Sequence, residues 1–410
     1  MLTDRRTLLK LALFGLACGG SPVRTAGERQ TKLSDDVLQA AAETSNLFAA
    51  DLQKLLGTEG GNLFFSPASI SAALAMTAAG AEGETRKEMF SVLHASGESD
   101  AWLRGMGGLS RLLNATGEGY TLQMANRLWG QNGFQFRADY LLRMEEQFAA
   151  PLGQVDFVGA PEPSREAINA WVAEQTRDRI KDLLPAGSIT GLTRLVLTNA
   201  IYFKADWRDE FNKKLTQEQP FRCADGKQVT LPLMNLEKSF PYAEDELAQV
   251  LELPYKSGGL SMVVILPKDK GGLSELEQQL TNERLSGWMK QLEPQSTMVF
   301  FPKFKLETQF SLAAALKKLG MPRAFDSRAE FGGMSTEAPL NISDVVHKAF
   351  VEVDEQGTEA AAATGVIMAT RAAPIQREPK VFRADHPFLF LIRHRESGAV
   401  LFAGRLSQPK

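Results

Sequence analysis

Cysteine and histidine are scarce in this chain, which has two Cys and four His among 410 residues. A disulfide within the folded part is excluded if the N-terminal residues are removed, because Cys223 then remains alone. No His has the spacing of a zinc site, and the sequence has neither a Gly-x-Ser-x-Gly elbow nor a phosphate-binding glycine loop. We therefore expect no metal and no cofactor, and the pattern disfavours an active hydrolase.

An excess of charge of one sign is also missing. The 46 basic and 49 acidic residues are well mixed and give a net charge of −3 at pH 7. A nucleic acid or an anionic membrane surface is therefore not expected as a main partner. The chain is 44% hydrophobic, which is ample for a large core. Because no linker is visible after residue 34, we expect a single domain over residues 34–410.

The N-terminal apolar run is too short to cross a bilayer. It covers residues 8–17, includes one Lys, and follows Arg5 and Arg6. Residues 1–20 are predicted to be an export signal and residues 21–33 a flexible tether, so we expect a periplasmic, cell-surface or extracellular protein. The paired arginines resemble a bacterial twin-arginine signal, and the general secretory route is the alternative.

Cys18 follows a sequence that looks partly like a lipoprotein cleavage box. Gly15 stands where that box usually has Leu, so both a lipid-anchored and a freely secreted protein stay open. Lipid attachment at Cys18 is the only membrane association that we expect.

Hydrophobic spacing predicts the order of helices and strands. Ser34 is a candidate N-cap for a helix that ends at Gly57, and residues 168–184 predict a second amphipathic helix. Residues 195–203 are nearly all apolar, which predicts a central strand buried on both faces. Two hairpins are expected, 250–253 with 260–266 and 388–393 with 399–404. Helices that precede strands favour an α+β fold.

Residues 350–371 combine a strand pattern with a run of small residues. Alternation from Val351 onward predicts a strand through residue 356, and the run from Gly357 to Gly365 contains a single charge, Glu359. Such a run is too poor in large apolar groups to build a core. It can stay solvated as a loop or enter a sheet as an extra strand.

Several motifs, in order along the chain, resemble one family, the serpins. Residues 62–71 resemble its shutter-region helix start, residues 197–207 the strand that ends at the breach tryptophan, and residues 386–393 and 398–405 its C-terminal strands. The hinge of an inhibitory serpin is matched by Glu355, Gly357, Thr358, Glu359, Ala360, Ala361, Ala362, Ala363 and Thr364. The resemblance runs from about Ser34 to the end of the chain. It implies an α+β fold with about three β-sheets and eight to nine helices, and an exposed reactive-centre loop at about residues 355–380.

The resemblance also implies roles for individual residues. The shutter, where the central sheet must open, would contain Ser66, Ser69, Asn199 and His347, and the breach Trp207 and Lys303. His347 would hydrogen-bond to Asn199, and Trp207 would also be a large core aromatic. Lys303 would pair with Glu355 at the root of the loop, and as a surface pair this would contribute about 0–1 kcal/mol.

The family's loop geometry places the reactive bond between Arg371 and Ala372, fourteen residues after Gly357. Because an Arg side chain pairs bidentately with a carboxylate, the expected partner is a trypsin-like serine protease. Cleavage would give a covalent acyl-enzyme, and the freed loop would insert into the central sheet.

The alternative is a non-inhibitory serpin that acts as a binding or storage protein. In an inserted strand alternate side chains share a face, so Thr358 would turn inward and the charged Glu359 outward, which favours inhibition. No dense Lys/Arg cluster occurs over residues 101–116, so a heparin-like activator is not expected. We expect a monomer.

Overall fold

The computed structural model describes residues 34–95, 99–114, 116–337, 339–358 and 378–409. Predictions on other residues lie outside the described part of the chain. They concern the export signal and tether, Cys18, the reactive bond Arg371–Ala372, and the hinge residues from Glu359 to Thr364.

The described residues form runs of helices and runs of strands, and most of the strand pairings are antiparallel, as in an α+β fold. The helices are α1 Asp35–Leu56, α2 Pro67–Ala78, α3 Gly83–Val92, α4 Ser99–Leu112, α5 Ala138–Phe148, α6 Pro161–Gln175, α7 Leu273–Gln279, α8 Asn282–Gln291 and α9 Ala313–Leu319. The strands are β1 Leu63–Phe65, β2 Thr116–Gly117, β3 Tyr120–Gln131, β4 Gly153–Val155, β5 Leu195–Asp206, β6 Gln217–Arg222, β7 Gln228–Glu244, β8 Ala248–Pro254, β9 Leu260–Pro267, β10 Glu293–Pro302, β11 Phe304–Ser311, β12 Asp344–Val353, β13 Gly357–Thr358, β14 Lys380–Arg383, β15 Phe388–His394 and β16 Val400–Leu406.

The described strands form two hydrogen-bonded sheets rather than the three expected. One has nine strands in the order β1-β16-β15-β9-β8-β7-β10-β14, with β6 on β7, and the other has the order β11-β12-β13-β5-β3-β2, with β4 on β3. The difference arises at β7, which is 17 residues long. Residues 228–233 of β7 pair with β6, residues 233–242 with β10 and residues 242–244 with β8, so this one strand joins all three into a continuous sheet.

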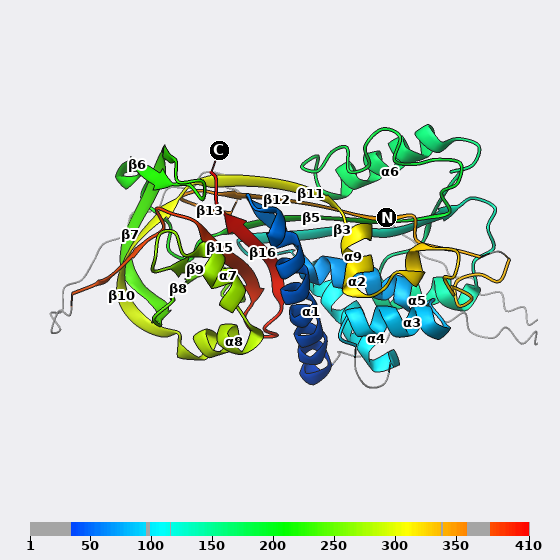
Figure 1. The fold of residues 1–410 in the computed structure, drawn as a ribbon, viewed down its shortest axis with the longest axis horizontal. Coiled ribbons are helices and arrows are strands. Elements are labelled where there is room, and N and C mark those ends of the chain that lie inside the picture. The colour runs from blue at the N-terminus through cyan, green and yellow to red at the C-terminus, as the bar shows by residue number, and fades with distance from the viewer. Residues whose placement is uncertain (1–33, 96–98, 115, 338, 359–377, 410) are drawn as a thin grey trace, which may run out of the picture. The chain divides into compact units, whose positions relative to one another are not determined.

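The seven-stranded sheet is covered on both faces, as Figure 1 shows, with α6 on one side and α2 on the other. Alternation along β5 divides its side chains between the two layers. Leu195, Leu197 and Ile201 pack in the large core with α2, whereas Val196 and Ala200 pack in the smaller core with α6. The predicted central strand, buried on both faces, is confirmed.

The predicted helix over residues 168–184 is confirmed for residues 168–175 and wrong beyond them, because α6 begins at Pro161 and ends at Gln175. Positive φ angles beyond its end, which interrupt a right-handed helix, occur at Arg177 (51°), Asp178 (61°) and Asp182 (52°). Ile180, Leu183 and Leu184 are nevertheless buried against the sheet. The apolar spacing of these three residues therefore indicated that they are buried, and not that they are helical.

The other element predictions agree with the structure, with small differences at element ends. The two hairpins appear as β8–β9 and β15–β16, both antiparallel. The first helix begins at Asp35 after Ser34, but the Ser34 side chain makes no capping hydrogen bond. The strand expected through residue 356 ends at Val353, because the chain turns at Asp354.

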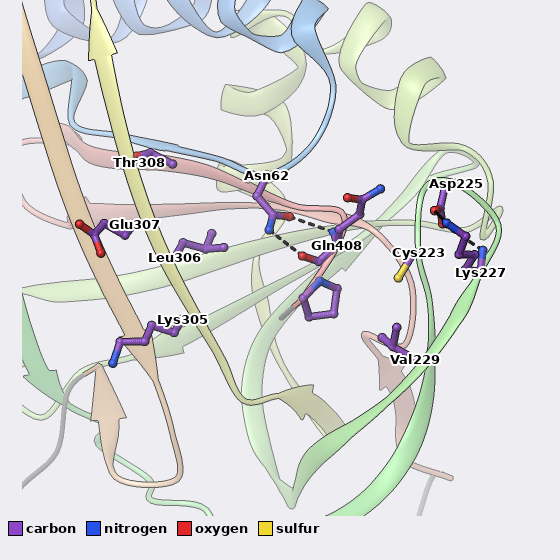
Figure 2. Close-up of a pocket in the computed structure, with 11 residues that line it drawn as sticks. Asn62, Cys223, Asp225, Lys227, Val229, Lys305, Leu306, Glu307, Thr308 and Gln408 are labelled. Atoms are coloured by element: carbon purple, nitrogen blue, oxygen red, sulfur yellow. Dashed lines mark hydrogen bonds and ion pairs between the residues drawn. The ribbon is translucent and has the colours of Figure 1, made fainter.

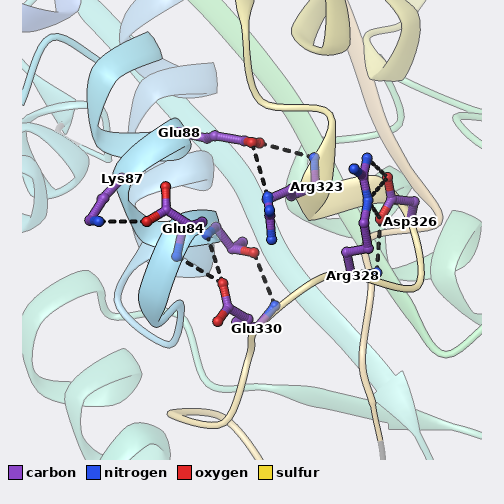
Figure 3. A network of polar contacts seen from close by, with 8 residues as sticks. Glu84, Lys87, Glu88, Arg323, Asp326, Arg328 and Glu330 are labelled. Carbon is purple, nitrogen blue, oxygen red and sulfur yellow. Dashed lines mark hydrogen bonds and ion pairs between the residues drawn. The ribbon is translucent and has the colours of Figure 1, made fainter.

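A polar network joins α3 to the segment that leads into β12, as Figure 3 shows. The Glu330 carboxylate accepts hydrogen bonds from the Glu84 and Thr85 N–H groups at 2.8 and 3.2 Å, and so caps the start of α3. The Thr85 hydroxyl accepts a return bond from the Glu330 N–H at 3.0 Å, and Arg323 pairs with Glu88 at 3.5 Å. These contacts fix the path of the chain toward β12.

Among the helices of the described residues, none combines the length and the apolar composition that a membrane span requires.

Candidate functional site

Two central strands of the seven-stranded sheet, β5 and β12, pair directly over only part of their length. Seven parallel register pairs, from Val196 with Asp344 to Tyr202 with Phe350, form what we call the seam. Beyond the seam the strands separate, and β13 lies between them. Gly357 pairs with Asp206 and Thr358 with Ala205 on one side, and Thr358 pairs with Val353 on the other. We call this point of entry the fork.

The chain reaches the fork through a tight turn after β12. The Asp354 carboxylate accepts hydrogen bonds from the N–H groups of Gln356 and Gly357 at 2.9 and 3.2 Å, and the Asp354 N–H donates to the Gly357 carbonyl at 2.9 Å. An acidic side chain that bonds its own backbone two residues on is a recurrent turn device. It reverses the chain so that β13 runs antiparallel to β12.

Gly357 is required at the fork by close backbone contact. A Cβ at this position would lie 2.0 Å from the Ala205 carbonyl oxygen, which is closer than any real contact. A side chain would therefore push β13 away from β5. This steric constraint explains why a glycine occupies this position of the predicted hinge.

Aromatic side chains form the floor of the fork. Thr358 is fully buried, and its hydroxyl lies 2.8 Å from the Tyr255 hydroxyl. The Tyr255 ring stacks on the Trp207 indole with ring centroids 4.7 Å apart. Trp207 also holds the turn, because its indole N–H donates to the Asp354 carbonyl at 3.0 Å and its backbone N–H to the Gln356 carbonyl at 2.7 Å.

Glu355 and Lys303 form an ion pair at 2.9 Å, but this is not the surface pair that the sequence suggested. The Glu355 side chain is only 4% exposed and also accepts the Thr216 hydroxyl at 2.8 Å. Burial raises the pKa of this carboxyl, but hydrogen bonds from Lys303 and Thr216 more than offset it, so the pKa is lowered overall. A buried carboxylate with two donors is costly to leave unpaired, so Lys303 fixes the root of the loop more firmly than an exposed pair would.

His347 and Asn199 face each other across the seam as register partners and are hydrogen-bonded through His347 Nδ1 and Asn199 Oδ1. The other ring nitrogen, Nε2, accepts the Ser66 N–H at 3.1 Å. An acceptor Nε2 means that the proton is on Nδ1 and that the ring is neutral. Burial agrees with this, because it lowers the pKa of His347 to about 3.

The other residues that the resemblance assigns to the shutter, Ser66 and Ser69, extend this contact across the sheet. Asn199 Nδ2 donates to Ser69 Oγ at 2.7 Å and to Asn126 Oδ1 at 2.5 Å, and Ser66 Oγ donates to the Leu401 carbonyl at 2.6 Å. Asn126 on β3 is the register partner of Asn199. The polar groups therefore form a row across β3, β5 and β12, buried between apolar layers.

The sequence prediction missed Asn126 and Tyr255. A signal for Asn126 exists, since it is an amide within a strand whose neighbours Met124, Ala125 and Leu128 are apolar and buried. No comparable signal marks Tyr255, because its importance comes from a partner 103 positions away.

A cavity of about 690 Å³ lies elsewhere in the described residues, and Figure 2 shows its lining. None of the predicted site residues line it. Two pairs of its lining residues bond to each other, Lys227 with Asp225 at 2.9 Å and Asn62 with the Gln408 carbonyl at 2.7 Å. Burial raises the pKa of the Cys223 thiol there, which disfavours a reactive thiolate. No group of three or more His, Cys, Asp or Glu in the described ranges could hold a metal ion.

Comparisons with known proteins agree with this geometry. The family model Serpin (serine protease inhibitor) matches residues 43–409. Leukocyte elastase inhibitor from Bos taurus is 44% identical over 382 residues, which cover 91% of this chain and 100% of that protein. The structure of uncleaved ovalbumin is similar with a TM-score of 0.81 and 31% identity over 90% of this chain and 100% of that one. Human thyroxine-binding globulin complexed with thyroxine gives a TM-score of 0.82 at 27% identity, covering 91% of this chain and 100% of that one.

Proposed function

Because this chain belongs to the serpin family of serine protease inhibitors, we propose that it is an inhibitor rather than an enzyme and that it acts by suicide trapping. The protease serine attacks the carbonyl carbon of Arg371, and the peptide bond to Ala372 breaks as its nitrogen leaves with a proton. Arg371 is then esterified to the enzyme. The freed segment from Glu359 onward continues β13 between β5 and β12 and carries the protease with it.

The position of β13 is the observation that carries this proposal. Gly357 and Thr358 already lie between the two strands that the loop would separate, so an inserted loop would continue an existing strand. The shutter residues Ser66, Ser69, Asn199 and His347 would hold the seam closed until cleavage. Trp207, Lys303 and Glu355 would hold the turn from which insertion proceeds.

The target that we propose is a trypsin-like protease. Arg371 at the reactive bond would pair with a carboxylate in the specificity pocket of such an enzyme. A similar protein is named as an elastase inhibitor, so the test includes both enzyme types. The protein is mixed with trypsin and, separately, with elastase, and complexes that survive boiling in detergent are measured.

Arg371→Ala should abolish the stable complex with trypsin, because the pocket carboxylate would lose its partner. Arg371→Lys keeps the charge and should retain part of the activity. Arg377→Ala is the matched control, a nearby Arg that should be dispensable. Full trapping by Arg371→Ala would disprove the assignment of the reactive bond to Arg371. Loss of trapping by Arg377→Ala would indicate that the reactive bond follows Arg377 instead.

A non-inhibitory serpin is the second candidate, favoured by the similarity to a globulin whose structure contains thyroxine. That function belongs to the other protein, and a binding role here would require loop insertion to be unimportant. A wild-type protein that is cleaved by every protease tested without forming a stable complex would support this second candidate.

We propose further that residues 1–20 direct export, by way of Arg5 and Arg6. Replacing both by Lys should leave full-length precursor in the cytoplasm if the twin-arginine route is used, and cell fractionation measures this. Normal export of the double-Lys protein would indicate the general secretory route. Mass spectrometry of the exported protein decides whether Cys18 carries a lipid.

A further inference from the structure

Tyr255 is a fully buried side chain whose ring is fixed from two sides. It follows β8 and forms an isolated antiparallel bridge with Trp207. Its ring stacks on the Trp207 indole at an interplanar angle of 5°, and the Phe203 ring meets it edge-on with centroids 5.3 Å apart. Because two large rings hold it, the direction of the Tyr255 hydroxyl is set by packing.

That hydroxyl points to the first residue of the hinge that enters the sheet. Tyr255 Oη and Thr358 Oγ1 are 2.8 Å apart, and both residues have no exposed surface. Buried hydroxyl groups almost always have a hydrogen-bond partner, and here each group provides it for the other. Burial also raises the pKa of Tyr255 far above its usual value, so the phenol keeps its proton at any pH of interest.

We propose that Tyr255 is a positioning residue for loop insertion, whose hydroxyl holds Thr358 in place between β5 and β12 before cleavage. This inference rests on the trapping mechanism proposed above. Insertion would then begin from a strand that is already seated, and the fork would not have to form after the acyl-enzyme appears. The contact also constrains residue 358, because an apolar side chain there would leave the Tyr255 hydroxyl without its partner.

The expected effect follows from competition between two fates of the acyl-enzyme. Insertion traps the protease, whereas water releases it active and leaves a cleaved inhibitor. Without the Tyr255 hydroxyl, Thr358 has an unpaired buried hydroxyl in the seated position, so the hinge spends less time there. Insertion starts later, and a larger fraction of the inhibitor is cleaved without trapping.

The first test is the Tyr255→Phe protein, which keeps the ring and removes only the hydroxyl. We expect the ratio of cleaved to trapped inhibitor, measured with trypsin, to rise about two- to tenfold, the range of one net hydrogen bond. Tyr140→Phe is the matched control. Tyr140 is also buried and donates one hydrogen bond, to the Met76 carbonyl at 3.1 Å, but it lies on α5 away from the fork. A general loss of stability would change both proteins alike.

The second test pairs Tyr255→Phe with Thr358→Val, which removes the other hydroxyl at nearly constant shape. If the two groups act through each other, the double variant should be no worse than the worse single one. Thr358→Ser keeps the hydroxyl, so this variant should divide between cleavage and trapping in the same ratio as the wild type. Additive effects of the two single changes would overturn the proposed contact.

A third measurement does not depend on any protease. Hydrogen exchange of the intact protein, followed on peptides that contain Gly357 and Thr358, reports how long β13 stays paired. Tyr255→Phe should speed exchange there and leave the seam strands unchanged. Unchanged exchange, or faster exchange with unchanged partitioning, would overturn the role of Tyr255. A wild-type protein that traps nothing would instead refute the proposed function, and the exchange result would still decide whether Tyr255 holds the hinge.

Discussion

At the scale of single residues, His347 shows how a buried titratable group can stabilise the closed sheet. Its neutral ring donates from Nδ1 to Asn199 across the seam and accepts the Ser66 N–H at Nε2. Protonation of Nε2 would remove that acceptor and leave the Ser66 N–H facing another N–H group, whereas Nδ1 would still donate to Asn199. The pKa of about 3 in the folded protein lies below the usual value of 6.5 for a free His. The folded state therefore prefers the neutral ring.

This lowered pKa predicts a pH dependence. The stability due to neutral His347 is fully present above pH 6.5 and is lost as the pH falls from 6.5 toward 3, at up to about 1.4 kcal/mol per pH unit. In His347→Gln this loss should be absent, because an amide does not titrate. We expect the difference in melting temperature between wild type and variant to shrink between pH 7 and pH 4. Parallel pH profiles would contradict the assignment, since the carboxylates titrate equally in both proteins.

The resemblance located His347, Asn199, Ser66 and Ser69 from sequence, whereas Asn126 was found only in the structure. The reason is physical. Asn126 meets Asn199 because β3 and β5 pair in one particular register, and 73 positions separate the two residues. Local spacing contains no information about that register, which the whole sheet sets.

At the scale of elements, strands and hairpins were predictable and one helix end was not. Residues 195–203 and the two hairpins have the composition that strands need, and burial agreed with the pattern. The stretch 176–184 kept helical apolar spacing but follows an irregular path with three positive φ angles. Contacts with the sheet outweighed local preference there, and such contacts cannot be read from the segment itself.

The cap on α3 gives a prediction at this scale. Glu330→Ala removes the carboxylate that accepts the Glu84 and Thr85 N–H groups, and it should destabilise the protein by about 0.5–2 kcal/mol. Glu330→Gln keeps an acceptor oxygen and should cost less. Glu84→Ala is the control, because it removes only an exposed pair with Lys87 and should change stability much less than Glu330→Ala does. Thermal unfolding measures all three, and equal effects of Glu330→Ala and Glu84→Ala would show that the cap is unimportant.

At the scale of the whole molecule, the proposed mechanism predicts that cleavage near Arg371 stabilises the protein. On insertion, the segment after Thr358 would pair on both sides and bury Val366 and Met368, at about 1–3 kcal/mol per large side chain. The cleaved protein should therefore melt at a much higher temperature than the intact one. Calorimetry of both forms tests this, and an equal or lower melting temperature would contradict trapping.

Thr358→Arg is the control for this prediction. It places a charge where Thr358 is now fully buried, at a cost of several kcal/mol in order of magnitude. Cleaved Thr358→Arg should gain little or no stability, and the variant should act as a substrate of trypsin. A large gain in this variant would show that the inward direction of Thr358 is wrong.

The directions of the strands at the seam favour insertion of the loop over its withdrawal. β5 and β12 run parallel, whereas β13 is antiparallel to both. Parallel ladders have slanted hydrogen bonds and are slightly weaker per residue than antiparallel ones. Each residue by which β13 lengthens would exchange one parallel pairing for two antiparallel pairings. The intact sheet is therefore closed by its weaker kind of ladder at the place where it is proposed to open. Insertion of the loop would gain antiparallel pairings at every residue, and withdrawal of the inserted strand would have to break them one by one.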